Sequence, residues 1–167
     1  MGLALREDDM KNAVPAVLLF LGVLMASPAL AERWAEYEDE THGCRLDYVS
    51  DLFSEDAVDK DDFQRFSGPN KNTYFRVKGL ANEENWTPAQ IRAEYIRERG
   101  SDVVYERTKS DFLVLSGIRG NNIYYTKVAL SSDNGTICVL DISYPRKKKR
   151  AFDAIVTRMS RSFTAED

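Results

Sequence analysis

The sequence contains very few of the side chains from which metal centres and nucleophilic active sites are built. There is one histidine, His42, and there are two cysteines, Cys44 and Cys138. A metal centre of His and Cys ligands needs several of them at short spacings, and the chain has neither a second histidine nor a Cys-x-x-Cys pair. These scarcities argue against the usual zinc sites, and we expect no bound metal.

Motifs of the common enzyme classes are absent as well. Ser116 lacks the glycine that a nucleophile elbow requires two residues earlier, because Val114 stands there. No Gly-rich phosphate loop or dinucleotide fingerprint occurs, and the acidic segment 54–62 lacks the spacing and the glycine of a calcium-binding loop. We therefore expect a protein that is not an enzyme and has no cofactor, with a solvated loop at 54–62.

An uncharged apolar run follows Lys11 and ends in Ala29-Leu30-Ala31, the pattern of a signal-peptide cleavage site. It predicts a signal peptide at 1–31, cleavage after Ala31 and a periplasmic protein. The acidic residues at 7–9 do not suit a leader and favour translation from Met10. An uncleaved membrane anchor is the alternative, which the prolines of the run disfavour.

Residues 32–167 are then expected to form one exported domain. When the two basic and three acidic residues of 1–31 are taken from the 23 and 27 of the chain, 21 basic and 24 acidic side chains remain, a net charge near −3. This balance does not favour nucleic-acid binding, and we expect no nucleic-acid partner.

Three runs of strand length occupy the middle of this domain, at 112–118, 123–130 and 137–144. They are rich in β-branched and aromatic residues, and turn residues separate them, with a tight turn at Asn134-Gly135. An antiparallel meander is predicted. Both alternating sets of side chains in these runs include apolar residues, as in strands that are covered on both faces.

Four more strands are expected, at Gly43–Val49, Phe63–Phe66, Thr73–Lys78 and Asp102–Arg107. The first is placed near the sheet edge, and 32–43 before it is interpreted as a polar lead-in that pins Trp34 and Tyr37 onto the domain. The predicted fold class is α+β, a twisted antiparallel sheet of about six to seven strands with helices packed on its faces.

Two helices complete this fold. The first begins with a capping box and a hydrophobic staple, formed by Thr87 with Gln90 and by Trp86 with Ile91. It should run from Pro88 to about Arg99, end at Gly100 and place Ala89, Ala93 and Ile96 on the sheet, with Ile91 and Tyr95 beside them. The second follows Tyr144-Pro145, ends near Ser162 and should close the second face of the sheet.

Cys44 and Cys138 both fall in predicted strands, in the same alternating sets as apolar neighbours. Both side chains should therefore point inward. In an exported protein this favours a disulfide between them, which would close a loop of about a hundred residues and contribute on the order of 4 kcal/mol. Two buried free thiols are the alternative.

The chain has one dense cationic run, which consists of Arg146, Lys147, Lys148, Lys149 and Arg150. It stands at the start of the second helix, where positive charge opposes the helix dipole by a few tenths of a kcal/mol per residue. A locally unfavourable feature suggests a use, such as docking on anionic lipid headgroups or on an acidic partner. A solvated helix face is the alternative.

The order of these signals resembles small exported proteins of Gram-negative bacteria, of alphaproteobacterial type. The resemblance rests on Gly43-x-x-Leu-x-Tyr48, Val103-x-Tyr105, Phe112-Leu-Val-Leu-Ser-Gly117, Tyr144-Pro145 and the closing Ser162-Phe163. Their fold is similar to that of PsbP of photosystem II and the Ran-binding Mog protein. The resemblance implies a docking or accessory module without catalysis, and it supplies no site residue.

Two functional hypotheses follow. The first is a non-catalytic periplasmic interaction or accessory module with a protein partner and a peripheral contact with a membrane surface as a further option. The second is a periplasmic binding protein for a small apolar or lipidic ligand. The second rests on a supply of aromatic side chains: Tyr74, Phe75, Tyr95, Tyr105, Tyr124 and Tyr125.

Overall fold

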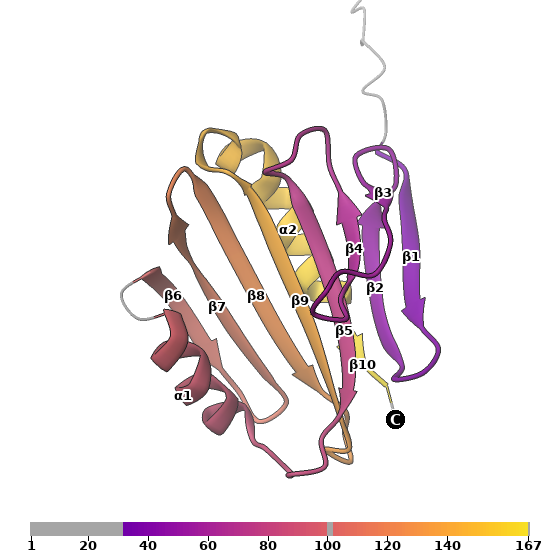
Figure 1. Cartoon of the computed structure of the whole chain (residues 1–167), viewed down its shortest axis with the longest axis vertical. Coiled ribbons are helices and arrows are strands. Elements are labelled where there is room, and N and C mark those ends of the chain that lie inside the picture. Colours follow the sequence, from indigo (N-terminus) through magenta and orange to yellow (C-terminus); the bar gives the residue numbers. More distant parts are fainter. Residues whose placement is uncertain (1–31, 100–101, 167) are drawn as a thin grey trace, which may run out of the picture. The chain divides into compact units, whose positions relative to one another are not determined.

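The computed structural model of the chain describes residues 32–99 and 102–166. The expected signal peptide and Gly100, the expected end of the first helix, lie outside the described residues. Within them the fold is α+β, as predicted, with two antiparallel sheets rather than one (Figure 1).

The larger sheet has seven antiparallel strands in the order β3-β4-β5-β9-β8-β7-β6. The predicted meander is confirmed as β7, β8 and β9, and the predicted turn is confirmed at Asn134, whose N–H donates to the Ser131 carbonyl at 3.0 Å. The strands are β3 (Ser54–Glu55), β4 (Gln64–Ser67), β5 (Tyr74–Ala81), β6 (Val103–Thr108), β7 (Phe112–Arg119), β8 (Asn122–Leu130) and β9 (Thr136–Pro145).

The smaller sheet, in the order β1-β2-β10, corrects two predictions. The segment interpreted as a lead-in contains β1 (Trp34–Asp39), which pairs with β2 (Cys44–Val49) over all six residues of each strand. Its apolar pattern is short and diluted, because exposed Glu36 and Glu38 flank the half-buried Tyr37. Since β10 (Thr164–Ala165) pairs with the other side of β2, β2 is a central strand and not an edge strand.

Helix α1 (Pro88–Arg99) begins as predicted. The Thr87 N–H donates to Gln90 Oε1 at 2.9 Å, and the Gln90 N–H donates to Thr87 Oγ1 at 3.4 Å. The predicted sheet-facing stripe is partly wrong, because Ala89 and Ala93 are exposed. The helix lies along the outer strands β6 and β7, so a narrower face that includes Ile91 reaches the sheet.

The second helix is confirmed. The basic run starts with the short 3-10 helix η2 (Arg146–Lys148) and continues into α2 (Lys149–Ser162), which buries Phe152, Ile155, Val156 and Met159. In Figure 1, α2 lies behind the larger sheet and α1 in front of it. Helix α2 closes only part of its face, and the smaller sheet covers the rest.

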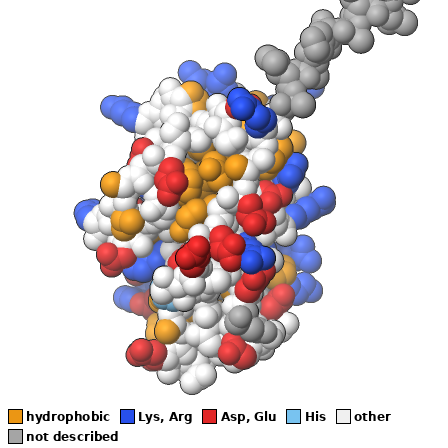
Figure 2. All heavy atoms as spheres, turned by 90° about the vertical axis from the view of Figure 1, so that its right-hand side faces the viewer, with side chains coloured by type: hydrophobic (Ala, Val, Ile, Leu, Met, Phe, Trp, Pro, Cys, Tyr) orange, Lys and Arg blue, Asp and Glu red, His pale blue; other side chains and the backbone are white. Residues whose placement is uncertain are grey.

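Aromatic rings fill the space between the two sheets. Tyr37 of β1 and Tyr48 of β2 pack on Phe66 of β4, with ring centroids 5.4 and 5.0 Å apart, and Phe66 stacks on Phe75 of β5 at 4.4 Å. Burial, with Asp39 and Glu55 nearby, raises the pKa of Tyr37 to about 12. Figure 2 views the molecule from the side of β1 and β3 and shows hydrophobic side chains in the middle, bordered by acidic ones.

Strand β9 confirms that the meander is covered on both faces. Cys138, Leu140 and Ile142 belong to the apolar cluster that includes α2 and the smaller sheet. Ile137 and Val139 belong to the cluster that includes α1. Every one of these five side chains has an exposed fraction of 9% or less, so β9 is the buried centre of the fold.

Lys127 of β8 fastens the end of α2. Its Nζ donates at 2.8 Å to the carbonyl oxygens of both Ser160 and Phe163. The last carbonyls of a helix have no partner within the helix, and a cation is favourable beside them. Burial lowers the pKa of Lys127, while the charge of Asp111 acts in the opposite direction.

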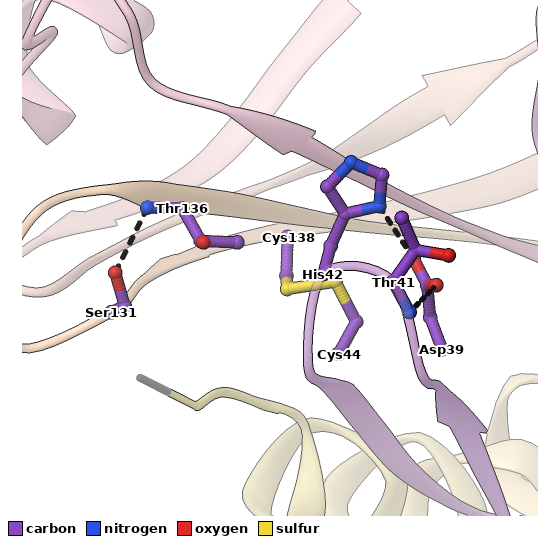
Figure 3. Close-up of a disulfide and its surroundings, with 7 residues drawn as sticks. All are labelled: Asp39, Thr41, His42, Cys44, Ser131, Thr136 and Cys138. Atoms are coloured by element: carbon purple, nitrogen blue, oxygen red, sulfur yellow. Dashed lines mark hydrogen bonds and ion pairs between the residues drawn. A yellow bond between two sulfur atoms is a disulfide. The ribbon is translucent and has the colours of Figure 1, made fainter.

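The predicted disulfide joins the two sheets. Cys44 of β2 and Cys138 of β9 are bonded, with their Cα atoms 5.7 Å apart, and Figure 3 shows them beside the β1–β2 turn. This turn packs on Gly79 of β5, where an added Cβ would lie 2.4 Å from the Cβ of His42. The disulfide and this close contact hold the smaller sheet against the larger one.

Removal of the disulfide should weaken the fold strongly. The bond closes a segment with a sequence separation of 94 residues. In the chain-entropy account of such loops, Cys44→Ala with Cys138→Ala should lower the free energy of unfolding by about 4 kcal/mol in urea titrations. Thiol alkylation of the unreduced, unfolded wild type should label neither cysteine. Labelling of both, with no difference in stability between wild type and variant, would contradict this prediction.

Candidate functional site

The side chains considered for catalysis do not come together. His42 lies in the β1–β2 turn, where its Nδ1 is 3.1 Å from Asp39 Oδ2. Ser116 lies on β7, separated from β5 beneath that turn by β8 and β9, and its Oγ donates to the Tyr124 carbonyl at 2.8 Å. In residues 32–99 and 102–166 no group of three or more His, Cys, Asp or Glu side chains is placed to hold a metal ion.

The acidic segment has a structural role at the front of the sheet. Burial raises the pKa of Asp59, but the N–H groups of Phe63 and Asp61 and the side chain of Arg76 outweigh this effect and lower it. Arg76 of β5 also pairs with Asp141 of β9 at 3.0 Å and lies over the ring of Phe63 at 4.1 Å. The carboxylate of Asp59 is therefore occupied in anchoring the loop.

All five side chains of the basic run are exposed. Neither η2 nor α2 has a side-chain cap or an acidic residue in its first turn, so nothing at the helix start offsets the positive charge locally. Lys149 pairs with Asp153 one turn later, at 2.8 Å. The side chains of the other four cations form no hydrogen bond or ion pair with any residue in the described part of the chain.

A hollow of about 900 Å³ borders the run. Three separate segments surround it: the β4–β5 loop, the β7–β8 turn and the start of η2. We call Lys71 of the β4–β5 loop together with Arg146–Arg150 the basic end. In Figure 1 it lies at the upper end of the sheet, where α2 begins, and basic side chains project from that end in Figure 2 as well. The hollow is lined by Asn70, Lys71, Asn72, Asn121, Asn122, Pro145, Arg146 and Lys147.

Hydrogen bonds hold these three segments in fixed positions. The Arg146 N–H donates to the Asn121 carbonyl at 2.8 Å. Asn122 Nδ2 lies 3.0 Å from both the Asn72 carbonyl and Ser143 Oγ. The basic end is therefore built on backbone segments that hydrogen bonds hold together. Lys71, Arg146 and Lys147 line its hollow, and such cations suit carboxylates or phosphates.

Packing beneath α2 adds to this order. Tyr144, at the end of β9, stacks on Phe152 of α2 with ring centroids 4.7 Å apart. Burial raises the pKa of Tyr144 to about 12, and the charge of Asp153 contributes in the same direction. The first turn of α2 is thus fixed to the end of β9, where the basic run begins.

Sequence reasoning found the run but missed its neighbours. Lys71 stands 75 positions before Arg146 in the printed numbering, and nothing in its own segment marks it as part of a site. The one sequence signal near Lys71 is the density of turn residues around it. These residues predict a loop, but they do not indicate that the loop lies beside the basic run. The role of the run in docking stays a prediction.

Comparison with known proteins supports the fold and goes no further. No family model matches the chain, and no curated protein matches it. The solution structure of the cyanobacterial PsbP protein CyanoP from Synechocystis sp. PCC 6803 superposes with a TM-score of 0.58 and 11% identity, over 83% of this chain and 95% of that one. The Ran-binding protein Mog1p of Saccharomyces cerevisiae superposes with a TM-score of 0.50 and 11% identity, over 80% of this chain and 95% of that one.

The chain has a PsbP/Mog-like fold. The expectation drawn from its strand and turn signals is confirmed at that level, because both comparisons span most of both chains. At 11% identity the likeness shows the fold alone, and no residue of either neighbour assigns a role here. In the described ranges, no helix is long and apolar enough to cross a membrane.

The hydrogen bonds of Asn122 should decide how firmly the basic end is held. Asn122→Ala removes the donor to Asn72 and Ser143, so we expect the free energy of unfolding to fall by about 1–2 kcal/mol in urea titrations. Asn121→Ala is the matched control, because Asn121 accepts from Arg146 through its backbone carbonyl, which the substitution keeps. Equal stability of both variants would show that the Asn122 side chain does not fasten these segments.

Proposed function

We propose that the protein is a non-catalytic, exported interaction module that binds an acidic surface of a protein partner through its basic end. The observation that carries the proposal is the set of four exposed cations whose side chains have no partner in the described chain. Two of them, Arg146 and Lys147, line one hollow together with Lys71. These cations repel one another and oppose the dipole of α2, so their clustering does not stabilise the fold. Binding to an acidic partner would account for the cluster.

A protein partner fits this surface better than a bilayer. Stable attachment to a bilayer usually combines positive charge with apolar side chains that enter it. The large hydrophobic side chains that the described chain exposes are Val58, Val104 and Tyr105, which lie in the acidic segment and on β6. None belongs to the basic end, whose hollow is bordered largely by asparagine side chains.

Export is part of the same proposal. The apolar leader with its Ala-Leu-Ala end supports it, and so does the Cys44–Cys138 disulfide, because such bonds persist mainly in oxidising compartments. The fold neighbours support an accessory role by analogy: one is named for binding Ran, and the other is a PsbP protein. By the same analogy we infer that this chain is not an enzyme and that 32–167 is its one exported domain.

Binding of a small apolar ligand is a second candidate function, but not through the aromatic set named from the sequence. Phe75 is fully buried in the core, Tyr105 is 52% exposed on β6, and Tyr125 contacts Ser160 on the α2 side. Tyr74 and Tyr124 line a hollow that also contains the charged side chains of Arg76 and Asp141. Tyr95 lines an apolar cavity between α1 and the sheet. This cavity is the specific observation that favours the second candidate.

Charge reversal at the basic end should separate stability from binding. Lys147→Glu with Lys148→Glu removes two cations from the start of α2, and each such change near a helix N-terminus is worth about 0.3–1 kcal/mol, so the melting temperature should rise. The affinity for a poly-glutamate peptide, measured by calorimetry at low salt, should fall about tenfold or more. Wild-type binding should weaken as salt is raised.

Lys60→Glu with Lys109→Glu is the matched control, because it makes the same change in net charge at exposed positions away from the basic end. It should leave peptide binding within about twofold of wild type after correction for net charge. Equal losses of peptide affinity in both variants would show that overall net charge, and not the basic end, determines binding. Binding of phosphatidylglycerol vesicles without binding of the peptide would overturn the proposal in favour of a membrane surface.

Export predicts the mass of the natural protein. When the full chain is expressed in a Gram-negative host, the purified periplasmic product should begin at Glu32, which intact-mass spectrometry and N-terminal sequencing can read directly. A product that retains Met1 or Met10, or one found only in the membrane fraction, would contradict cleavage after Ala31.

A further inference from the structure

A second hollow, of about 390 Å³, lies between α1 and the front of the larger sheet. We call it the α1 pocket. It is separate from the basic end, with which it shares no lining residue. Its volume lies at the small end of the range of about 300–1,000 Å³ that is usual for ligand sites. The pocket is lined by Leu80, Ala81, Asn82, Glu83, Glu84, Trp86, Ile91, Tyr95, Val128, Ile137 and Val139.

The floor of the pocket is apolar and fixed. Val128, Val139 and Ile137 come from β8 and β9, and their exposed fractions are 0%, 7% and 9%. Ile91 of α1, 6% exposed, packs in the same apolar cluster. A ligand would meet these side chains in their native arrangement, without repacking of the core.

The wall of the pocket is held by Asn82. Its side-chain amide donates to the carbonyls of Trp86 and Asn134, at 3.0 and 2.9 Å, and its Oδ1 accepts the Trp86 N–H at 2.8 Å. Asn82 is 6% exposed, so this network is part of the core. It ties the segment before α1 to the β8–β9 turn and holds the backbone of Trp86 in place.

Aromatic and acidic groups meet at the mouth. Trp86 and Tyr95 are half-buried, and Glu83 and Glu84 are exposed. Glu84 accepts a hydrogen bond from the indole Nε1 of Trp86, which keeps one carboxylate beside the ring. No lysine or arginine lines the pocket. Aromatic faces and carboxylates together favour a cation, and they disfavour an anion such as a fatty acid.

We propose that the α1 pocket binds a small apolar ligand that carries a positive charge, such as an aryl or alkyl ammonium compound. The apolar body would lie on Val128 and Val139, with the ammonium group at Trp86 and Glu84. This inference rests on the second candidate function and gives it a site and a ligand class. The volume excludes a lipid with two long acyl chains, and the acidic mouth excludes free carboxylic acids.

The chain offers a direct optical test, because it has only two tryptophans and Trp34 lies on β1, away from the pocket. In a Trp34→Phe background the remaining fluorescence comes from Trp86. Benzyltrimethylammonium should change this signal with a saturable dissociation constant in the millimolar range or below. Phenylmethanesulfonate, of similar size and opposite charge, should bind at least tenfold more weakly.

Glu83→Gln with Glu84→Gln should weaken binding of benzyltrimethylammonium at least tenfold. It should also reduce the difference in affinity between this cation and phenylmethanesulfonate. Glu36→Gln with Glu40→Gln is the control, because it removes two exposed carboxylates from the β1 region. Filling the floor with Ile137→Phe should block the probe, and thermal melts will show whether that variant is folded. Equal binding of both probes, no saturable signal, or equal effects of both Gln pairs would each overturn the inference.

The same samples keep the two proposals apart. The Glu83 and Glu84 variants should bind poly-glutamate as the wild type does, because the basic end is unchanged. If the ammonium probe does not bind but the peptide does, only the proposal of a ligand site in the α1 pocket is refuted. If the peptide does not bind but the ammonium probe does, the proposed docking role of the basic end is refuted and the second candidate function is retained.

Discussion

The fold depends on covering both faces of β9. Its alternating side chains, Leu140 and Ile142 on one face and Ile137 and Val139 on the other, are almost completely buried, so neither face can be left to solvent. On one side α2 and the smaller sheet provide the cover, and the disulfide ties that sheet to β9 itself. On the other side α1 covers only part of the sheet, and this incomplete cover leaves the α1 pocket.

Much of this arrangement could be predicted from short-range signals. The capping box at Thr87 located the start of α1, and the alternation in the meander located three strands, because both depend on residues close in sequence. The sequence misled at β1, where acidic residues occupy half of a strand. It also misled at Ala89 and Ala93, which fit an apolar helix stripe but face solvent. Whether a helix crosses a sheet or lies along its edge depends on tertiary packing, which periodicity does not report.

The same distinction applies to the candidate site. Five adjacent cations are visible in any reading of the sequence, whereas Lys71 and the asparagines reach them only through the pairing of β5, β8 and β9. The front of the sheet shows the opposite situation, since carboxylates of its acidic segment form ion pairs with Arg65, Arg76 and Lys78 of the neighbouring strands. The two charge clusters thus differ in their partners. Carboxylates of the acidic segment form ion pairs within the fold, whereas most cations of the basic run have no side-chain partner in the described chain. The proposed docking role follows from that difference.

The most direct test is to map where an acidic ligand touches the protein. Amide chemical shifts of isotope-labelled 32–167 should be recorded during titration with a poly-glutamate peptide at low and at high salt. We expect shifts that are confined to residues 70–73, 120–122 and 146–150 and that diminish at high salt. Shifts at β6 or around the smaller sheet, or no shifts at any salt concentration, would contradict the claim that the basic end is the interaction surface of this fold.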